Sequence, residues 1–184
     1  MNLQKHSANN ETTTSKKVTI VLFATYLLVL FWIILFKLHK PFTSIRSRRH
    51  LNLIPFHQPM ILNGKIDYSE MILNVVIFIP LGVYSGILFQ KQGFVKQILF
   101  CLLVSLSFET LQYIFALGAS DITDIITNTF GGVIGLIILT VTKKLFSNNI
   151  RAHNLINILA VIATILIVSF LFLLKMNMLP IRYQ

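Results

Sequence analysis

Charged residues are scarce in this chain. Only 12% of its 184 residues are Asp, Glu, Lys or Arg, while 55% are hydrophobic. Soluble domains carry roughly 25% charged residues, so the composition excludes a soluble globular domain and predicts an integral membrane protein. The length leaves room for one membrane bundle and none for a separate soluble domain.

Acidic residues are the rarest charged class. Six Asp and Glu stand against 16 Lys and Arg, which gives a formal net charge of +10. On a soluble protein this excess would indicate a nucleic-acid partner. Beside long apolar runs it indicates basic loops that face anionic phospholipid and set the topology, so no nucleic-acid partner is predicted.

Sequence signatures of well-known chemistry are also missing. The single cysteine, Cys101, lies in an apolar run, which excludes an intrachain disulfide and a cysteine metal motif. The chain contains no HExxH pattern, Walker loop or nucleophile elbow. These absences favour a binding protein over an enzyme, although they do not exclude catalysis.

Long apolar runs are present, and they predict an all-α, polytopic bundle of about five transmembrane helices. Residues 1–17 form a polar N-terminal tail. The predicted membrane domain is 18–142, and one further C-terminal span follows it. The five spans are residues 18–36, 71–89, 97–117, 123–142 and 154–174.

Prolines interrupt two of the apolar segments. Residues 51–62 are too short to span a membrane and contain Pro55 and Pro59, so they are predicted to be interfacial or re-entrant. Pro80 lies in the middle of the second span, where the loss of one backbone hydrogen bond predicts a kink.

The short loops predict the orientation. Residues 118–124 contain two Asp and neither Lys nor Arg, whereas residues 90–96 and 143–153 are basic. Positive loops remain in the cytoplasm. The pattern therefore places the N-terminus in the cytoplasm and the acidic turn outside.

Polar residues at membrane depth gather within residues 105–135. Glu109 and Gln112 are three residues apart, and Asp121, Asp124 and Asn128 are spaced by three and four. Each set therefore shares one helix face. If the third and fourth spans form a hairpin, these two faces converge in an outward-facing acidic pocket.

Several roles fit such a cluster. Glu109, Asp121 and Asp124 are candidate ligands of a divalent cation such as Mg²⁺ or Ca²⁺, and no other cofactor is predicted. The same groups suit sugar hydroxyls or amide donors of a head group, or acid–base chemistry. Asp121 or Ser120 alternatively caps the N-terminus of the fourth span.

Three glycines lie within the fourth span. Gly131 and Gly135 form a GxxxG pattern, with Gly132 beside it. Small residues at this spacing permit close approach of two helices. Packing against the second or third span of the same chain is favoured over homodimerisation, and the oligomeric state is left open.

Four blocks carry a family resemblance. They are NLIPF at 52–56, NVVIFIPLG at 74–82, FETLQYIFALGASDITDIITNTFGG at 108–132 and IG at 134–135. Their order and spacing resemble the VanZ-like family over about residues 20–140. Gly118 and Ala119 stand where many members have a Gly-Arg pair. The matching residues are Asn52, Pro55, Phe56, Asn74, Phe78, Pro80, Gly82, Glu109, Gln112, Asp121, Asp124, Asn128, Gly131 and Gly132.

The resemblance implies a multi-pass protein of the bacterial cytoplasmic membrane that supports resistance to glycopeptide antibiotics, chiefly teicoplanin. The favoured hypothesis is that the acidic pocket binds a lipid-linked cell-wall precursor, a lipid or the lipoglycopeptide drug. One alternative is a small membrane enzyme that modifies a lipid or wall precursor. Another is a structural partner of a second membrane protein.

Overall fold

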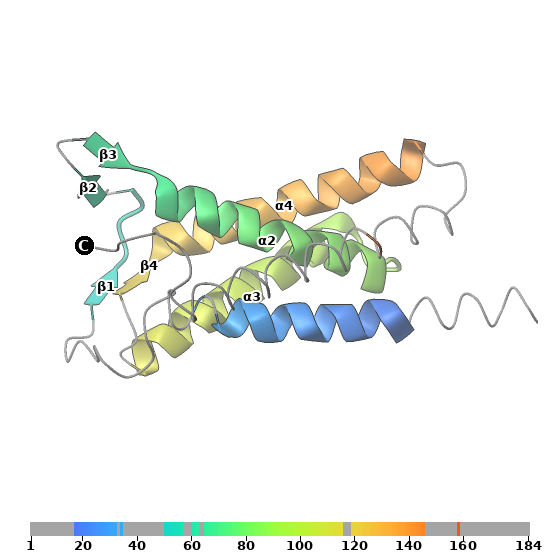
Figure 1. The fold of residues 1–184 in the computed structure, drawn as a ribbon, viewed down its shortest axis with the longest axis horizontal. Coiled ribbons are helices and arrows are strands. Elements are labelled where there is room, and N and C mark those ends of the chain that lie inside the picture. Colours follow the sequence, from blue (N-terminus) through green and yellow to red (C-terminus); the bar gives the residue numbers. More distant parts are fainter. Residues whose placement is uncertain are drawn as a thin grey trace, which may run out of the picture. The chain divides into compact units, whose positions relative to one another are not determined.

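The computed structural model divides the chain into two units. One comprises Met1–Val29 with Phe146–Gln184, and the other comprises Leu30–Leu145, which holds the strands and long helices of Figure 1. The residues that the structure describes are 17–32, 34, 50–56, 60–62, 65–115, 119–145 and 158.

Three described helices are long and apolar enough to cross a membrane. They are α2 (Ser69–Leu88), α3 (Phe94–Ile114) and α4 (Ile122–Leu145). At 1.5 Å per residue, about 20 residues match a hydrocarbon core of about 30 Å. The second, third and fourth predicted spans are therefore confirmed as helices, with ends close to the predicted ones.

The predicted count of five spans is not confirmed. Lys17–Trp32 forms an apolar helix that is shorter than the predicted span 18–36. The predicted fifth span at 154–174 lies outside the described residues apart from residue 158. Residues 1–16 of the predicted polar tail also lie outside them.

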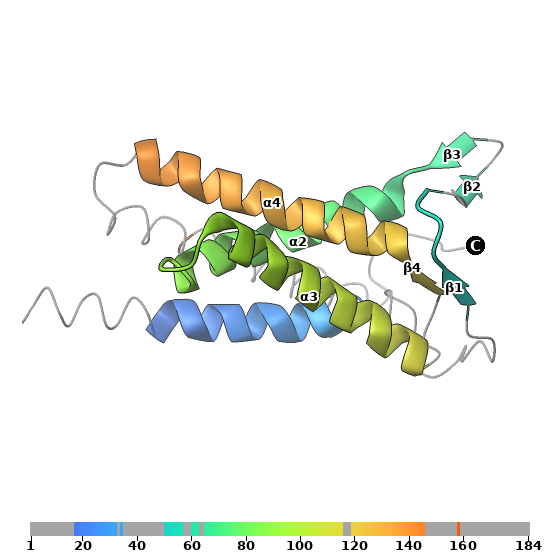
Figure 2. The same ribbon diagram turned by 180° about the vertical axis from the view of Figure 1, so that it is seen from behind.

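Short strands that the all-α prediction missed lie at one end of the helices (Figures 1 and 2). β1 (His50–Asn52) pairs in parallel with β4 (Ala119–Asp121), and Asn52 stands opposite Asp121. β2 (Met60–Leu62) pairs antiparallel with β3 (Lys65–Asp67). The β1–β4 pairing brings a segment far away in the sequence to the start of α4. The interfacial or re-entrant location of residues 51–62 stays a prediction.

Among the helices that the structure describes, α2 and α4 pack most closely, and glycines permit this. A Cβ atom on Gly131 would meet the carbonyl oxygen of Val75, and one on Gly135 would meet that of Ile79. Gly82 faces the backbone of Gly132 in the same way. Helix backbones approach this closely only where a side chain is absent, so the prediction of packing within the chain is confirmed.

The centre of the second unit is apolar. Phe78, on α2, is fully buried and makes an edge-to-face ring contact with Phe108 of α3 at 6.5 Å between centroids. Cys101 is buried against Gly132, as expected for a small core residue. α2 continues through Pro80 as one helix, so the predicted kink does not interrupt it.

Candidate functional site

Asp121 caps the N-terminus of α4. The helix begins at Ile122, and the Thr123 N–H donates to Asp121 Oδ1 at 2.7 Å. A carboxylate here satisfies an unpaired N–H and meets the positive end of the helix dipole. The capping prediction is thereby confirmed, and the capping residue is Asp121 rather than the buried Ser120.

Asp121 also links α4 to two other elements. Asn52 Nδ2, at the end of β1, donates to Asp121 Oδ2 at 3.0 Å. The Asp121 N–H in turn donates to Glu109 Oε2 on α3 at 3.0 Å. One residue therefore holds the β1 segment, the end of α3 and the start of α4 together.

The turn after β1 is held by side chains. The Ile54 N–H donates to Asn52 Oδ1 at 3.1 Å, and the Phe56 N–H donates to Thr123 Oγ1 at 3.0 Å. Phe56 has a φ of 57°, a left-handed conformation that costs free energy in a residue other than glycine. It follows the matched residue Pro55. Thr123 was not among the residues predicted for the site. Its position two residues after a capping Asp is the only feature of the sequence that could have indicated its role.

Two further hydrogen bonds join the remaining predicted residues across helices. Asn74 Nδ2 on α2 donates to Asp124 Oδ1 at 2.8 Å. Asn128 Nδ2 donates to Ser105 Oγ on α3 at 3.0 Å. Ser105 was not among the candidate site residues, although it lies one turn from Glu109 on the same face of α3.

The Gln112 side chain makes its hydrogen bond to a backbone group and not to another predicted site residue. Its Nε2 donates to the backbone carbonyl oxygen of Ile34 at 2.8 Å. The side chain is fully buried and shares its helix face with Glu109. Gln112 is therefore at the edge of the cluster, and its described hydrogen bond does not lead to a carboxylate.

All seven candidate binding residues thus lie in one region, formed by the end of α3, the start of α2, the start of α4 and the end of β1. We call these seven residues, together with Ser105 and Thr123, the polar network. Glu109 and Asp124 are only 2% and 7% exposed. Charges are expensive at such depth unless they are well paired or serve a function. The network consists of Asn52, Asn74, Ser105, Glu109, Gln112, Asp121, Thr123, Asp124 and Asn128.

The cation hypothesis receives no support from this geometry. Within the described residues, no three His, Cys, Asp or Glu side chains come together as a set that could hold a metal ion. Asp121 accepts from Asn52 and Thr123, and Asp124 accepts from Asn74. These carboxylates face amide and backbone donors, which are the partners expected for hydrogen bonding rather than for metal ligation.

The Asn52–Asp121 link predicts a reciprocal rescue. In Asp121→Asn, two amide NH₂ groups face each other, and in Asn52→Asp, two carboxylates do. Each single change should cost about 1–3 kcal/mol, the range for a buried group that loses its partner. The double change Asn52→Asp with Asp121→Asn exchanges donor and acceptor and keeps every hydrogen bond described above.

Melting temperatures in detergent test this exchange as a double-mutant cycle. Both single variants should melt below the wild type, and the double variant should recover most of the loss. A double variant that shows the sum of the two single losses would mean that the two side chains do not interact.

Three helices that are long and apolar enough to cross a membrane define a polytopic helical membrane protein, with a network of carboxylates and amides at one end of these helices. The VanZ/LLP1 family model matches residues 23–147. The chain is also 44% identical over 125 residues to Protein VanZ from Enterococcus faecium. The aligned segment covers 67% of this chain and 74% of that relative. This chain therefore belongs to the VanZ/LLP1 family. No solved structure matches it.

Proposed function

We propose that this protein supports resistance to glycopeptide antibiotics such as teicoplanin by binding a membrane-borne ligand at the polar network. The ligand is a lipid-linked wall precursor, a lipid or the lipid-bearing drug. The main observation in support is that carboxylates and amides from β1, α2, α3 and α4 come together in the polar network. Ionisable residues within membrane segments usually mark substrate or ion pathways, which supports a ligand role for the buried residues Glu109 and Asp124.

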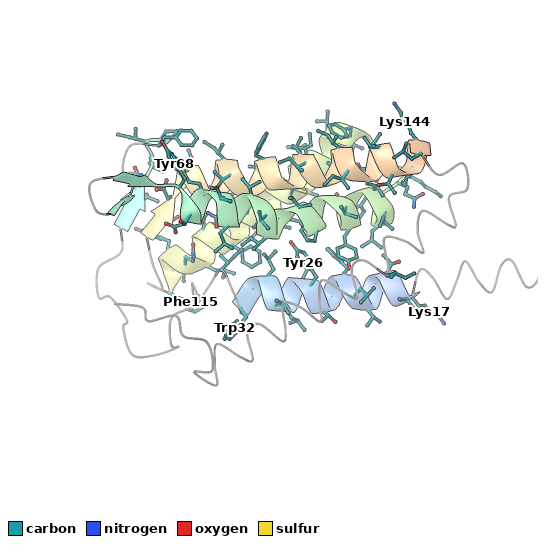
Figure 3. All side chains as sticks on the ribbon, turned by 45° about the horizontal axis from the view of Figure 1, so that its top comes forward. Lys17, Tyr26, Trp32, Tyr68, Phe115 and Lys144 are labelled. Carbon is teal, nitrogen blue, oxygen red and sulfur yellow. The ribbon has the colours of Figure 1, made fainter. Side chains whose placement is uncertain are left out.

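We further propose that the polar network faces the cell exterior and that the N-terminus is cytoplasmic. Lys91 follows α2, and Lys96 lies in the first turn of α3. Lys143 and Lys144 lie in the last turn of α4. Figure 3 shows Lys144 at the end of the helices opposite Tyr68 and Phe115. Positive residues favour the cytoplasmic side, and aromatic residues favour an interface.

Cysteine labelling tests this orientation. Because Ser120 is buried, exposed positions at the two ends of α2 are better reporters. In a Cys101→Ala background, Ser69→Cys should react with a membrane-impermeant maleimide in intact cells, whereas Gln92→Cys should react only after lysis. The reverse pattern would invert the orientation.

The function is tested by expression in a teicoplanin-sensitive host. The protein should raise the inhibitory concentration of teicoplanin, and an empty vector should not. Purified protein incubated with a labelled lipid-linked precursor should retain the label without changing it chemically. Formation of a new labelled product would favour the alternative of a membrane enzyme. An unchanged inhibitory concentration at good membrane abundance would contradict the proposal.

A further inference from the structure

Two amide side chains of the polar network have an unpaired end. Gln112 is 0% exposed, and its Oε1 has no hydrogen-bond partner among the described residues. Its Nε2 donates to the carbonyl oxygen of Ile34. Because a carbonyl oxygen only accepts, this bond fixes the orientation of the amide. The unpaired end of Gln112 is therefore an acceptor.

Asn128 shows the same feature on α4. The side chain is 2% exposed, and its Oδ1 is unpaired in the described part of the chain, while its Nδ2 donates to Ser105 Oγ. In this orientation the unpaired end is Oδ1, an acceptor like that of Gln112. Buried polar groups nearly always find a partner, so these two oxygens are available to a donor group of a ligand.

Glu109 lies on α3 with Gln112 and Ser105. Gln112 is three residues after it on α3, and Ser105, which holds Asn128, is four residues before it. Both spacings place side chains on one helix face about 5–6 Å apart at Cβ. Along α3, Glu109 therefore stands between Gln112 and Ser105, the residue whose hydroxyl accepts the hydrogen bond from Asn128.

An ammonium group fits this arrangement. It carries a positive charge and three N–H donors, which match one carboxylate and two amide oxygens. A phosphate fits poorly, because it offers acceptors and negative charge to groups of the same kind. A quaternary ammonium has the charge without the donors.

A membrane-borne source of the ammonium fits the surroundings. The three residues lie on helices that are long and apolar enough to cross a membrane. The turn next to the network exposes Leu53, Ile54 and Phe56 by 65%, 56% and 55%. Such side chains suit a hydrocarbon boundary rather than water.

We infer that the polar network binds the primary ammonium group of a membrane amphiphile, with Glu109 as counter-ion and the Gln112 and Asn128 oxygens as neutral acceptors. This inference rests on the proposed function and narrows the chemical class of its ligand. It adds that recognition depends on N–H donors as well as on charge.

A graded lipid series tests the donor requirement. Purified full-length protein is placed in phosphatidylglycerol nanodiscs that contain an equal share of phosphatidylethanolamine or its N-methyl, N,N-dimethyl or N,N,N-trimethyl derivative. The charge is constant while the donors fall from three to none. Lipid retention by native mass spectrometry should fall in the same order. Equal retention of all four lipids would overturn the inference.

Two further experiments test whether the ammonium group belongs to a membrane lipid and whether Gln112 and Asn128 bind it. Glycerophosphoethanolamine, the same head group without acyl chains, should not compete at equal concentration, and effective competition would overturn the membrane-borne assignment. Gln112→Met and Asn128→Leu should each weaken the preference for the donor-rich lipid. Should either variant fold poorly, the wild-type series still decides. Equal retention together with loss of resistance in Glu109→Gln would overturn this inference and leave the proposed function standing.

Discussion

Glu109→Gln and Asp124→Asn will lower teicoplanin resistance to near that of the host without the protein, at unchanged membrane abundance. Each amide keeps the shape of the carboxylate and an oxygen that accepts the existing bond from the Asp121 N–H or from Asn74. The charge is lost, and one acceptor oxygen becomes an NH₂ donor. A hydrogen bond to a charged group contributes about 1.5–3 kcal/mol, so ligand binding should weaken roughly ten- to a hundredfold.

A matched control separates this effect from a general effect of charge. Glu70 lies exposed in the first turn of α2, and Glu70→Gln should leave resistance unchanged. Neutralising a buried carboxylate should not hinder membrane insertion. If resistance falls only in proportion to abundance, the network is structural. That result would favour the alternative in which this protein is a structural partner of another membrane protein. Full resistance in both buried-site variants would exclude a charged binding site.

Gly131→Val will abolish most of the folded protein. The new side chain would enter the backbone of α2 at the Val75 carbonyl, with the Phe78 Cβ at 3.0 Å from the first added carbon. Overpacking usually costs about 1–3 kcal/mol, and a helix backbone yields less than a side chain does. α2 and α4 would have to separate, which would also pull Asn74 away from Asp124.

Gly93→Val provides the comparison. Gly93 precedes α3 with an extended backbone, and a Cβ there would meet nothing within 4 Å. The melting temperature in detergent and the membrane abundance should both collapse for Gly131→Val and stay near the wild type for Gly93→Val. Equal melting of the two variants would mean that the glycine face of α4 is not the contact described.

The sequence predicted what depends on local pattern. Apolar runs located α2, α3 and α4, and spacing by three and four placed Glu109 with Gln112 and Asp121 with Asp124 on shared helix faces. The cap at Asp121 and the close packing at Gly131 also follow from local rules, since each depends on the residue type and its position in one helix.

Contacts between distant segments could not be predicted in this way. The three-residue strand β1 is too short for a pattern of its own, and its partner β4 lies 69 residues further along the chain, beyond the reach of any local rule. In the structure the pairing is accompanied by a hydrogen bond between the side chains of Asn52 and Asp121. The Thr123 hydroxyl that holds the Phe56 N–H, and the Ser105 hydroxyl that meets Asn128, likewise depend on tertiary approach. Hydroxyls are common in membrane helices, so their presence in the sequence does not mark a partner.

Native mass spectrometry of protein extracted directly from the membrane tests the central claim most directly, because it weighs any ligand held at the polar network. The account predicts that wild-type protein carries a bound amphiphile as a discrete added mass. Glu109→Gln and Asp124→Asn should lose that mass while Glu70→Gln keeps it. The same added mass on all four proteins, or none on the wild type, would contradict a ligand site at the buried carboxylates.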